Sequence, residues 1–136
     1  MIAEDQNLAF DALNNALKAA GEATRLRILA LLAETELTVS DLIEILRQSQ
    51  PRISRHLKLL AEAGLVERHR EGAWAFFRMS ENRGGGELAR ALIARLDPAD
   101  RTLTRARARL AAVRQPRAGA APGYFRAPAA EWGRIR

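Results

Sequence analysis

The stretch LTVSDLIEILRQSQPRISRHLKLLAEAGLVERHREGAWAFFRM, residues 37–79, decides the fold. Thr38 stands three residues before Asp41, a capping box that predicts the start of a short helix ending at about Leu46. Ser49 is a good N-cap, and Pro51 falls in the first turn, where its missing N–H removes no helical hydrogen bond. A short helix, a brief turn and a longer helix are therefore expected in succession.

The longer helix is predicted to be amphipathic. Ile53, Leu57, Leu60 and Ala61 recur at i, i+4, i+7 and i+8, a spacing that places them on the side facing the core. Basic and polar side chains occupy most of the remaining positions. Gly64 follows as the expected helix terminator, because glycine adopts the left-handed conformation without steric cost.

Two strands are predicted after this helix, from Leu65 to Arg70 and from Ala73 to Met79, with a tight turn at Glu71-Gly72. β-Propensity is high in the second strand, where Trp74 and Phe76 are expected to pack within the hairpin rather than stack on bases. The order of helix, turn, helix and hairpin predicts a mainly α fold with a small β-hairpin. This is a winged helix-turn-helix with about five or six helices plus a two-stranded wing.

Further helices are predicted on both sides of this unit from their apolar stripes. Their expected ranges are about Gln6 to Ala20, Ala23 to about Ala33, Glu87 to Leu96, and Asp100 to about Gln115. The three glycines Gly84 to Gly86 are expected to form a flexible hinge, because they do not follow a strand and open onto a pocket as a cofactor-binding loop would.

The composition fits one compact domain. The chain has 136 residues, 48% of them hydrophobic, and no cysteine, which excludes disulfides, thiolate metal sites and thiol redox sensing. The sequence shows neither a membrane-length apolar run nor a secretory signal, so a cytoplasmic protein without a membrane partner is expected. The expected organisation is a DNA-binding and dimerisation domain at residues 1–97, a helix at 98–115 that contacts a dimer partner, and a basic linker or tail at 116–136.

The charge is placed unevenly along the chain. The net charge is +6 overall, but residues 47–78 carry +4 and residues 98–136 carry +7, while residues 1–46 carry −5. The positive charge of the folded body therefore lies on the predicted helix-turn-helix and wing, as binding to phosphates requires. For the basic tail, contact with DNA and a solvated surface remain equally open.

Recognition of DNA needs side chains that reach base edges and donors that hold phosphates. Arg can grip guanine O6 and N7, Gln can bind adenine N6 and N7, and a helix N-terminus favours phosphate. The predicted DNA-binding residues are Gln48, Ser49, Gln50, Arg52, Ser54, Arg55, His56, Lys58, Arg68 and Arg70. Alternatives stay open for several of them: Ser54 could bond within its helix, His56 could pack beside the wing, and the arginines could be solvated.

Four motifs in order resemble the ArsR family of bacterial repressors. LKAAGEATRLRILALL at residues 17–32 resembles the family's opening, and ELTVSDL at 36–42 its third helix. QSQPRISRHLKLLAEAGLV at 48–66 is similar to its recognition helix, and REGAWAFFRM at 70–79 to its wing. The resemblance covers about residues 8–97. It implies a homodimeric winged helix that represses by covering a promoter and releases DNA on binding a metal ion or another inducer.

The chain departs from the family where metals bind. The metalloid-sensing branch carries two cysteines in its third helix, at positions that here hold Thr38 and Ser40. The other common site uses His and carboxylates on the last helix, but residues 87–115 contain no His. His56 and His69 fall in the recognition helix and the wing. No metal site and no cofactor are therefore expected, and an inducer, if there is one, should be organic or should act through a further C-terminal domain.

The end of the chain carries a second, shorter resemblance. GYFRAPAAEWGRIR at residues 123–136 is similar to the segment that joins ArsR-like domains to S-adenosylmethionine-dependent methyltransferase domains. This suggests S-adenosylmethionine or a related compound as the first inducer to test. It also leaves open that the chain is the non-catalytic head of a methyltransferase. A winged helix that binds proteins instead of DNA is a third hypothesis.

The expected partners are double-stranded DNA and a second copy of the chain, with an organic inducer as a further candidate. No catalytic constellation with a pocket is visible, so an enzyme is not expected. Apolar stripes on the first and the last two helices exceed what one small core covers, which predicts dimer contacts. The predicted dimer residues are Leu13, Leu17, Leu88, Leu92, Ile93, Leu103 and Leu110. Arg25 and Arg27 are expected to be surface or intersubunit charges.

Overall fold

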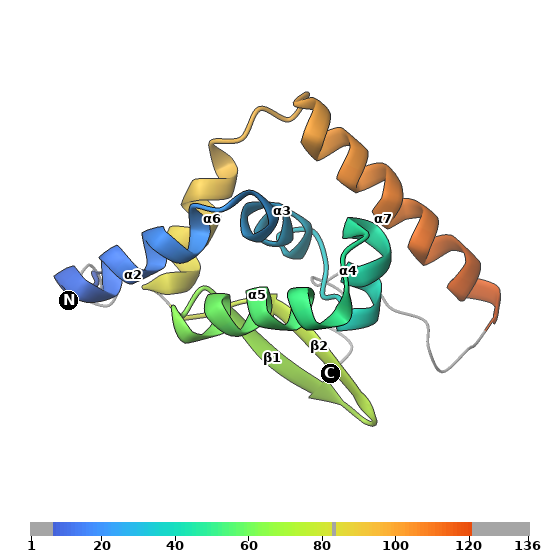
Figure 1. Ribbon diagram of the computed structural model, residues 1–136, viewed down its shortest axis with the longest axis horizontal. Helices are drawn as coiled ribbons and strands as arrows, with labels where there is room; N and C mark the ends of the chain where they lie inside the picture. Colours follow the sequence, from blue (N-terminus) through green and yellow to red (C-terminus); the bar gives the residue numbers. More distant parts are fainter. Residues whose placement is uncertain (1–6, 83, 121–136) are drawn as a thin grey trace.

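The computed structural model describes residues 7–82 and 84–120, with side chains up to Arg114. Over this part of the chain it has six helices and one antiparallel hairpin (Figure 1). The elements are α2 (Phe10–Ala20), α3 (Ala23–Leu32), α4 (Val39–Leu46), α5 (Gln50–Glu62), β1 (Val66–Glu71), β2 (Trp74–Met79), α6 (Gly85–Ala94) and α7 (Arg101–Ala120). The predicted mainly α winged helix-turn-helix is confirmed.

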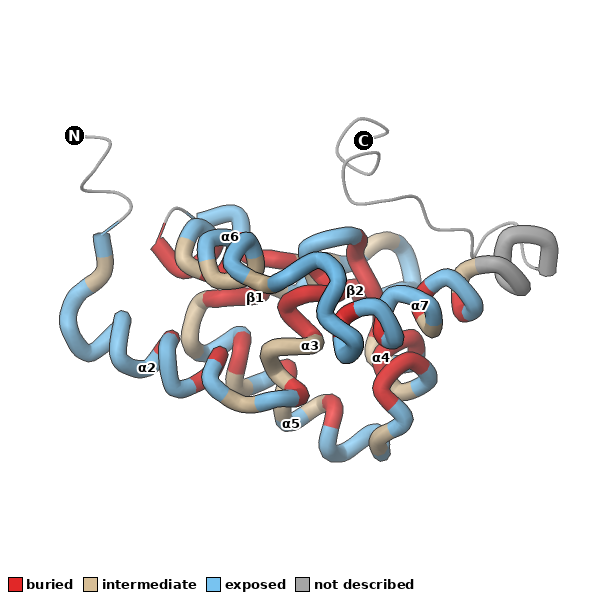
Figure 2. The backbone as a smooth tube through the Cα atoms, turned by 90° about the horizontal axis from the view of Figure 1, so that it is seen from above, coloured by how far each residue is buried: buried red, intermediate tan, exposed pale blue. Residues whose placement is uncertain are grey.

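Helix α3 is the centre of the core. Ile28, Leu29, Leu31 and Leu32 on this helix are at most 2% exposed. The helix packs against α2, α5, α6, α7 and β2, so it is covered from several sides (Figure 1). This explains why its sequence is apolar around more than one face. By contrast, most of α2 is exposed (Figure 2).

The first described helix starts later than predicted. A helix was expected from about Gln6, but α2 begins at Phe10, after Ala9 in an extended conformation with φ −61° and ψ 157°. Ala9 has no side chain that could cap the helix, so no local signal in the sequence marks this start. The end is as expected, because the Gly21 N–H donates to the carbonyl of Leu17.

The turn of the wing is shifted by one residue from the prediction. Glu71 pairs with Trp74, so the two-residue turn is Gly72-Ala73 rather than Glu71-Gly72. Gly72 takes the first turn position with φ +62°, where an L side chain would be strained. The first strand also begins at Val66, one residue after the predicted start at Leu65.

The three glycines after the wing are packing residues, not a flexible hinge. A Cβ on Gly85 would lie 2.1 Å from the carbonyl oxygen of Gly64, and one on Gly86 would lie 2.1 Å from that of Ser80. The side chain of Asn82 adds a bond, since its Oδ1 accepts from the Gly86 N–H at 2.9 Å. The start of α6 is therefore pressed against the end of the recognition helix and of the wing.

Helix α7 belongs to the core of its own chain. Leu103 is 7% exposed and Leu110 is 2% exposed, because α7 packs against α3 and α4. The prediction that these two leucines contact a dimer partner is therefore wrong: neighbouring helices of the same chain cover them. The helix also runs to Ala120, past the predicted end near Gln115 and through the predicted start of a linker at Pro116. Residues 121–136 of the expected tail lie outside the described part.

Within the described residues, no helix is both long and apolar enough to cross a membrane.

Candidate nucleic-acid interface

The buried side of α5 determines which of its side chains are free. Ile53, Leu57 and Leu60 are at most 2% exposed and face the core, as predicted, whereas Ala61 is exposed and not part of the core face. On the opposite side, Arg55 and Lys58 are exposed. The helix therefore presents a basic face away from the body of the protein.

Polar side chains cap the start of α5. Ser49 is the N-cap, and its hydroxyl accepts from the Arg52 N–H at 3.4 Å. Pro51 lies in the first turn, and its missing N–H leaves the helical ladder intact. The Gln50 amide donates to Ser54 Oγ at 2.7 Å, so these two polar groups form a pair on one flank of the exposed face. The Ser54 side chain thus bonds within its own helix, one of the alternatives considered for it.

The chain reaches α5 through a strained residue. Arg47 follows α4 in the left-handed conformation, with φ 58° and ψ 46°. Its N–H donates to the carbonyl of Ile43 as the last helical bond, and its left-handed backbone then ends α4. Arg47 is exposed next to the recognition helix and was not among the predicted DNA-binding residues. Its position before the N-cap is the signal that could have identified it.

Seven of the ten predicted DNA-binding residues are exposed on the described surface. These are Ser49, Gln50, Arg52, Arg55, Lys58, Arg68 and Arg70. Gln48, Ser54 and His56 are half-buried. The exposed basic residues come from one helix face and one strand of the wing, so the fold gathers positions that lie up to about 20 residues apart in the sequence.

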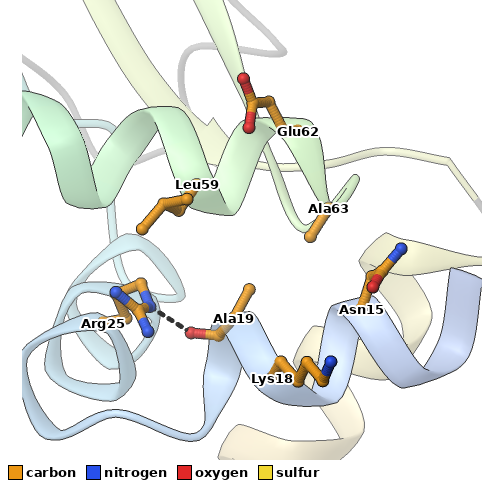
Figure 3. Close-up of a pocket in the computed structure, with 7 residues that line it drawn as sticks. All are labelled: Asn15, Lys18, Ala19, Arg25, Leu59, Glu62 and Ala63. Atoms are coloured by element: carbon orange, nitrogen blue, oxygen red, sulfur yellow. Dashed lines mark hydrogen bonds between the residues drawn. The ribbon is translucent and has the colours of Figure 1, made fainter.

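Two of the half-buried residues are held by α3. The Gln48 amide donates to Thr24 Oγ1 at 2.9 Å, and the Arg25 guanidinium donates to His56 Nδ1 at 3.1 Å. Arg25 also donates to the carbonyl of Ala19 at 2.5 Å (Figure 3). Arg25 is therefore an internal link between α2, α3 and the recognition helix, not the surface charge that was expected.

The link to Arg25 determines the state of His56. A guanidinium can only donate, so Nδ1 must accept and the neutral ring carries its proton on Nε2. Burial lowers the pKa of His56, and Arg25, Arg52 and Arg55 lower it further, against the opposing charge of Glu22. Glu22 caps α3, and the hydrogen bond from the Arg25 backbone N–H lowers the pKa of its carboxyl group. His56 is thus a neutral structural contact of the recognition helix.

The wing has a fixed base and a basic outer strand. Leu37 and Phe77 exchange backbone hydrogen bonds at 3.1 and 2.8 Å, which ties β2 to the segment before α4. Arg78 donates to Glu67 at 2.8 Å and to buried Glu36 at 3.4 Å, so this arginine is structural. Arg68 and Arg70 on β1 remain exposed for an external partner.

The two aromatic residues of the wing differ in their surroundings. Phe76 is 3% exposed, which confirms its predicted packing role. Trp74 is 42% exposed beside the turn, so its packing is less complete than expected. His69 lies 3.1 Å from Glu71 across one face of β1. Among the described residues, no three His, Cys, Asp or Glu side chains lie together in a way that could hold a metal ion.

A cleft lies behind the C-terminal half of the recognition helix (Figure 3). It has a volume of about 320 Å³ and opens between α2, α3 and α5. Its charged lining consists of Lys18, Arg25 and Glu62. A second cleft of about 240 Å³ lies between α3 and the start of α7 and is mostly apolar. Either could admit a small molecule next to an element that positions α5.

Known proteins resemble this chain over its central part. A family of bacterial regulatory proteins, the arsR family, matches residues 22–68. An uncharacterised HTH-type transcriptional regulator of Methanocaldococcus jannaschii is 45% identical over 67 residues, which are 48% of this chain and 75% of the relative. The arsenical resistance operon repressor of Escherichia coli is 50% identical over 64 residues, 46% of this chain and 55% of that repressor. This chain thus spans only slightly more than half of the length of the Escherichia coli repressor.

A solved structure shows the same architecture. The homodimeric winged helix-turn-helix DNA-binding domain of a possible ArsR-family regulator from Mycobacterium bovis superposes with a TM-score of 0.54 at 32% identity. The match covers 62% of this chain and 73% of that one. The fold and its exposed basic helix define a winged helix-turn-helix regulator of transcription. The chain belongs to the ArsR family of bacterial regulators, as its motifs suggested.

Acid should destabilise the fold through His56. Because the pKa of His56 lies below its usual 6.5 in the folded protein, the unfolded chain takes up the proton first as the pH falls. The free energy of unfolding should therefore decrease from about pH 6.5 downward, through the folded-state pKa. Urea denaturation between about pH 7.5 and pH 5 measures this change.

The matched variants are His56→Gln and His69→Gln. His56→Gln should have a flatter pH dependence than wild type, because the group responsible no longer titrates. His69→Gln keeps His56 and should retain the wild-type dependence. An unchanged pH dependence in His56→Gln would contradict the assignment.

Proposed function

We propose that the chain is a homodimeric repressor that binds a palindromic promoter site through α5 and the wing. The observation that carries this proposal is the exposed row Arg52, Arg55 and Lys58 on α5, opposite its buried leucines. Arg52 and Arg55 lie in the first half of the helix, the part that enters the major groove in this motif. Lys58 lies further along and is suited to a phosphate. Arg68 and Arg70 would hold the adjacent backbone.

The apolar surface of α2 supports a dimer. Phe10 is 84% exposed, Leu13 39% and Leu17 47%, a set of large side chains that water does not favour on a free surface. Leu92 and Ile93 on α6 are half-buried against the core. Both views place α2 and α6 at the same end of the molecule, away from the wing tip (Figures 1 and 2). We propose that α2 and α6 form the interface, as an apolar surface at the centre of a two-fold assembly.

The control of binding is proposed to be organic rather than metallic. Thr38 stands where the metalloid-sensing branch has a cysteine, and here its hydroxyl accepts from the Asp41 N–H at 3.1 Å in a capping box. This residue therefore has a structural task of its own. The chain has no cysteine to provide thiolate ligands. The two clefts beside α3 are the places where an organic inducer could act on α5.

Substitutions on the recognition helix test the DNA-binding assignment. Arg52→Ala or Arg55→Ala should cost roughly 1–3 kcal/mol and relax specificity at one base position if the arginine reads a base. Lys58→Ala should weaken binding to all sequences about equally, since a phosphate contact carries no sequence information. Selection of bound DNA followed by affinity measurements on the selected site gives both quantities. Arg101→Ala, at an exposed position in the first turn of α7, is the control.

The result that contradicts this assignment is wild-type binding by Arg52→Ala, Arg55→Ala and Lys58→Ala alike. The selected site should also be palindromic, with half-sites about one helical turn or a multiple apart, because a two-fold protein mirrors its symmetry in the operator.

Light scattering should give about twice the chain mass of 15.0 kDa. Leu13→Asp with Leu17→Asp should yield a monomer, since a charge at an apolar interface loses its water without a partner. Ala108→Asp, at an exposed position of α7, is the control and should leave the dimer intact. A monomeric wild type at micromolar concentration, or a double variant that stays dimeric, would refute the α2 interface.

Metals should not release the protein from DNA. Zinc, cadmium and arsenite at stoichiometric concentration are expected to leave operator binding unchanged, because the usual thiolate and imidazole ligands are missing. Fluorescence anisotropy of a labelled operator measures release, with high salt as the positive control. S-adenosylmethionine is the first organic compound to titrate. Stoichiometric release by any of the three metals would overturn the non-metal proposal, whereas lack of response to S-adenosylmethionine leaves the repressor assignment intact.

A further inference from the structure

The cleft between α3 and the start of α7 is lined mainly by apolar side chains. It has a volume of about 240 Å³, and its apolar lining includes Leu26 and Ala30 on α3, Leu96 before α7, and Leu103 and Ala106 on α7. Leu26 and Leu96 are half-buried, so part of their apolar surface remains in contact with water. An apolar cavity of about 150 Å³ holds benzene. The cleft therefore has room for an aromatic ring with a short side chain.

Two charged residues line the same cleft, and they differ in their partners. Asp100 is engaged at the start of α7, where its Oδ2 accepts from the backbone N–H of Thr102 at 2.9 Å and of Leu103 at 3.3 Å. Arg27 is half-buried, and its guanidinium donates to Thr24 Oγ1 at 3.4 Å. Within the described part of the chain, Arg27 forms no ion pair with a carboxylate. The cleft therefore offers a cation without a counter-ion, which favours an anionic ligand over a cationic one.

The first two turns of α3 separate this cleft from the recognition helix. Leu26, Arg27 and Ala30 on one side of α3 line the cleft. Thr24 and Arg25 on the same two turns bond instead to Gln48, just before α5, and to the recognition helix itself. In Figure 1 the start of α7 and α5 lie on opposite sides of α3. A ligand in the cleft would therefore touch the helix that holds α5 without approaching the basic face.

One hydroxyl connects the cleft to the start of α5. Thr24 Oγ1 accepts from Arg27 at 3.4 Å and from the Gln48 amide at 2.9 Å. Gln48 stands one residue before Ser49, the N-cap of α5. The other side-chain atom of Gln48, its Oε1, is buried and has no hydrogen-bond partner among the described residues. The bond to Thr24 is therefore what holds the Gln48 side chain, and Arg27 shares the acceptor of that bond.

We propose that the cleft between α3 and α7 binds a small organic acid with an apolar, ring-sized body, and that the bound acid lowers the affinity for the operator. The body fills the apolar lining, and the carboxylate accepts from the Arg27 guanidinium. Arg27 then leaves Thr24, which changes the group that holds Gln48 before α5. A ligand that favours this altered arrangement draws the protein away from the form that binds DNA. The effect on DNA rests on the proposed function, whereas binding of the acid does not.

The test uses three probes that share one apolar body and differ in charge: phenylacetate, phenylethanol and phenylethylamine. Calorimetric titration of the full chain without DNA measures their binding. Arg27→Gln removes the cation of the cleft, and Ala106→Leu fills part of its apolar space. Arg105→Gln removes the same charge from an exposed position of α7 outside the lining and is the matched control. Unfolding curves check that each variant keeps the fold.

Phenylacetate should bind with a Kd of about 1 mM or tighter, which is within reach of a ligand of its size. It should bind about tenfold more tightly than phenylethanol, because a hydrogen bond between charged groups adds to the shared apolar contact. Phenylethylamine should bind most weakly, since it brings a second cation next to Arg27. Arg27→Gln should lose about tenfold in affinity for the acid and stay within about twofold for the alcohol. Ala106→Leu should weaken both, and Arg105→Gln should behave like wild type.

Anisotropy of the selected operator measures the second half of the proposal. Saturating phenylacetate should raise the Kd for the operator by about fivefold or more in wild type and in Arg105→Gln, but not in Arg27→Gln. Equal binding of the three probes, no binding of phenylacetate, or an unchanged affinity in Arg27→Gln overturns the site. Binding of phenylacetate without an effect on the operator overturns its regulatory role. If wild type selects no DNA at all, the proposed function fails, and the calorimetric result still decides whether the site exists.

Discussion

The burial of Ile53, Leu57 and Leu60 in the core is the constraint on which the interface depends. Once this side of α5 is covered, the helix can rotate no further about its axis without exposing leucine. The positions on the opposite side are then fixed, and they hold Arg55 and Lys58. The N-terminal end of α5 is polar for a second reason. The N–H groups of its first turn have no partner within the helix, so they need the N-cap Ser49, water or an anion as acceptor. The packing of α5 thus orients the basic side chains towards solvent before any partner binds.

The first turn of α3 holds the recognition helix from behind at two points. Thr24 accepts from Gln48 just before α5, and Arg25 bonds to His56 within it. Arg25 also holds the last turn of α2 through the carbonyl of Ala19. Because these bonds are short and their donors and acceptors half-buried, a displacement of the corner between α2 and α3 would change the position of α5. This corner therefore provides a physical connection between α2, where the dimer contact is proposed, and the recognition helix.

The wing is fixed to the body at its base and free towards its turn. The Leu37–Phe77 pair extends the hairpin by one bridge, and Arg78 bonds to Glu36 and Glu67 from both sides. Because Gly85 has no side chain, α6 can begin directly against the carbonyl of Gly64. The segment that follows the wing is thus packed against the residue that follows α5. These contacts hold the base of the hairpin that carries Arg68 and Arg70 against the body of the protein, next to the recognition helix.

The sequence by itself determined the local elements. Capping residues such as Thr38 and Ser49, the terminator Gly64 and the apolar period of α5 predicted the helix-turn-helix and its exposed face, because caps and periodicity act within a few residues. The hairpin was predicted as well, although its turn lies one residue later than expected, since cross-strand pairing sets the register and a single glycine does not.

Only the tertiary structure determined which partners side chains such as Arg25 have and how α7 packs. Nothing near Arg25 or His56 in the sequence shows that they meet, because they are 31 residues apart and the bond forms only when α3 packs on α5. Leu103 and Leu110 have the spacing of an interface, and the same spacing serves a helix that folds back on its own chain. The three glycines at 84–86 suggested a flexible segment, but in the fold this segment is closely packed. A side chain is excluded there only because the carbonyls of Gly64 and Ser80 come close in the tertiary structure. An apolar stripe predicts that the residues are buried. Only the tertiary structure shows whether the same chain or another chain covers them.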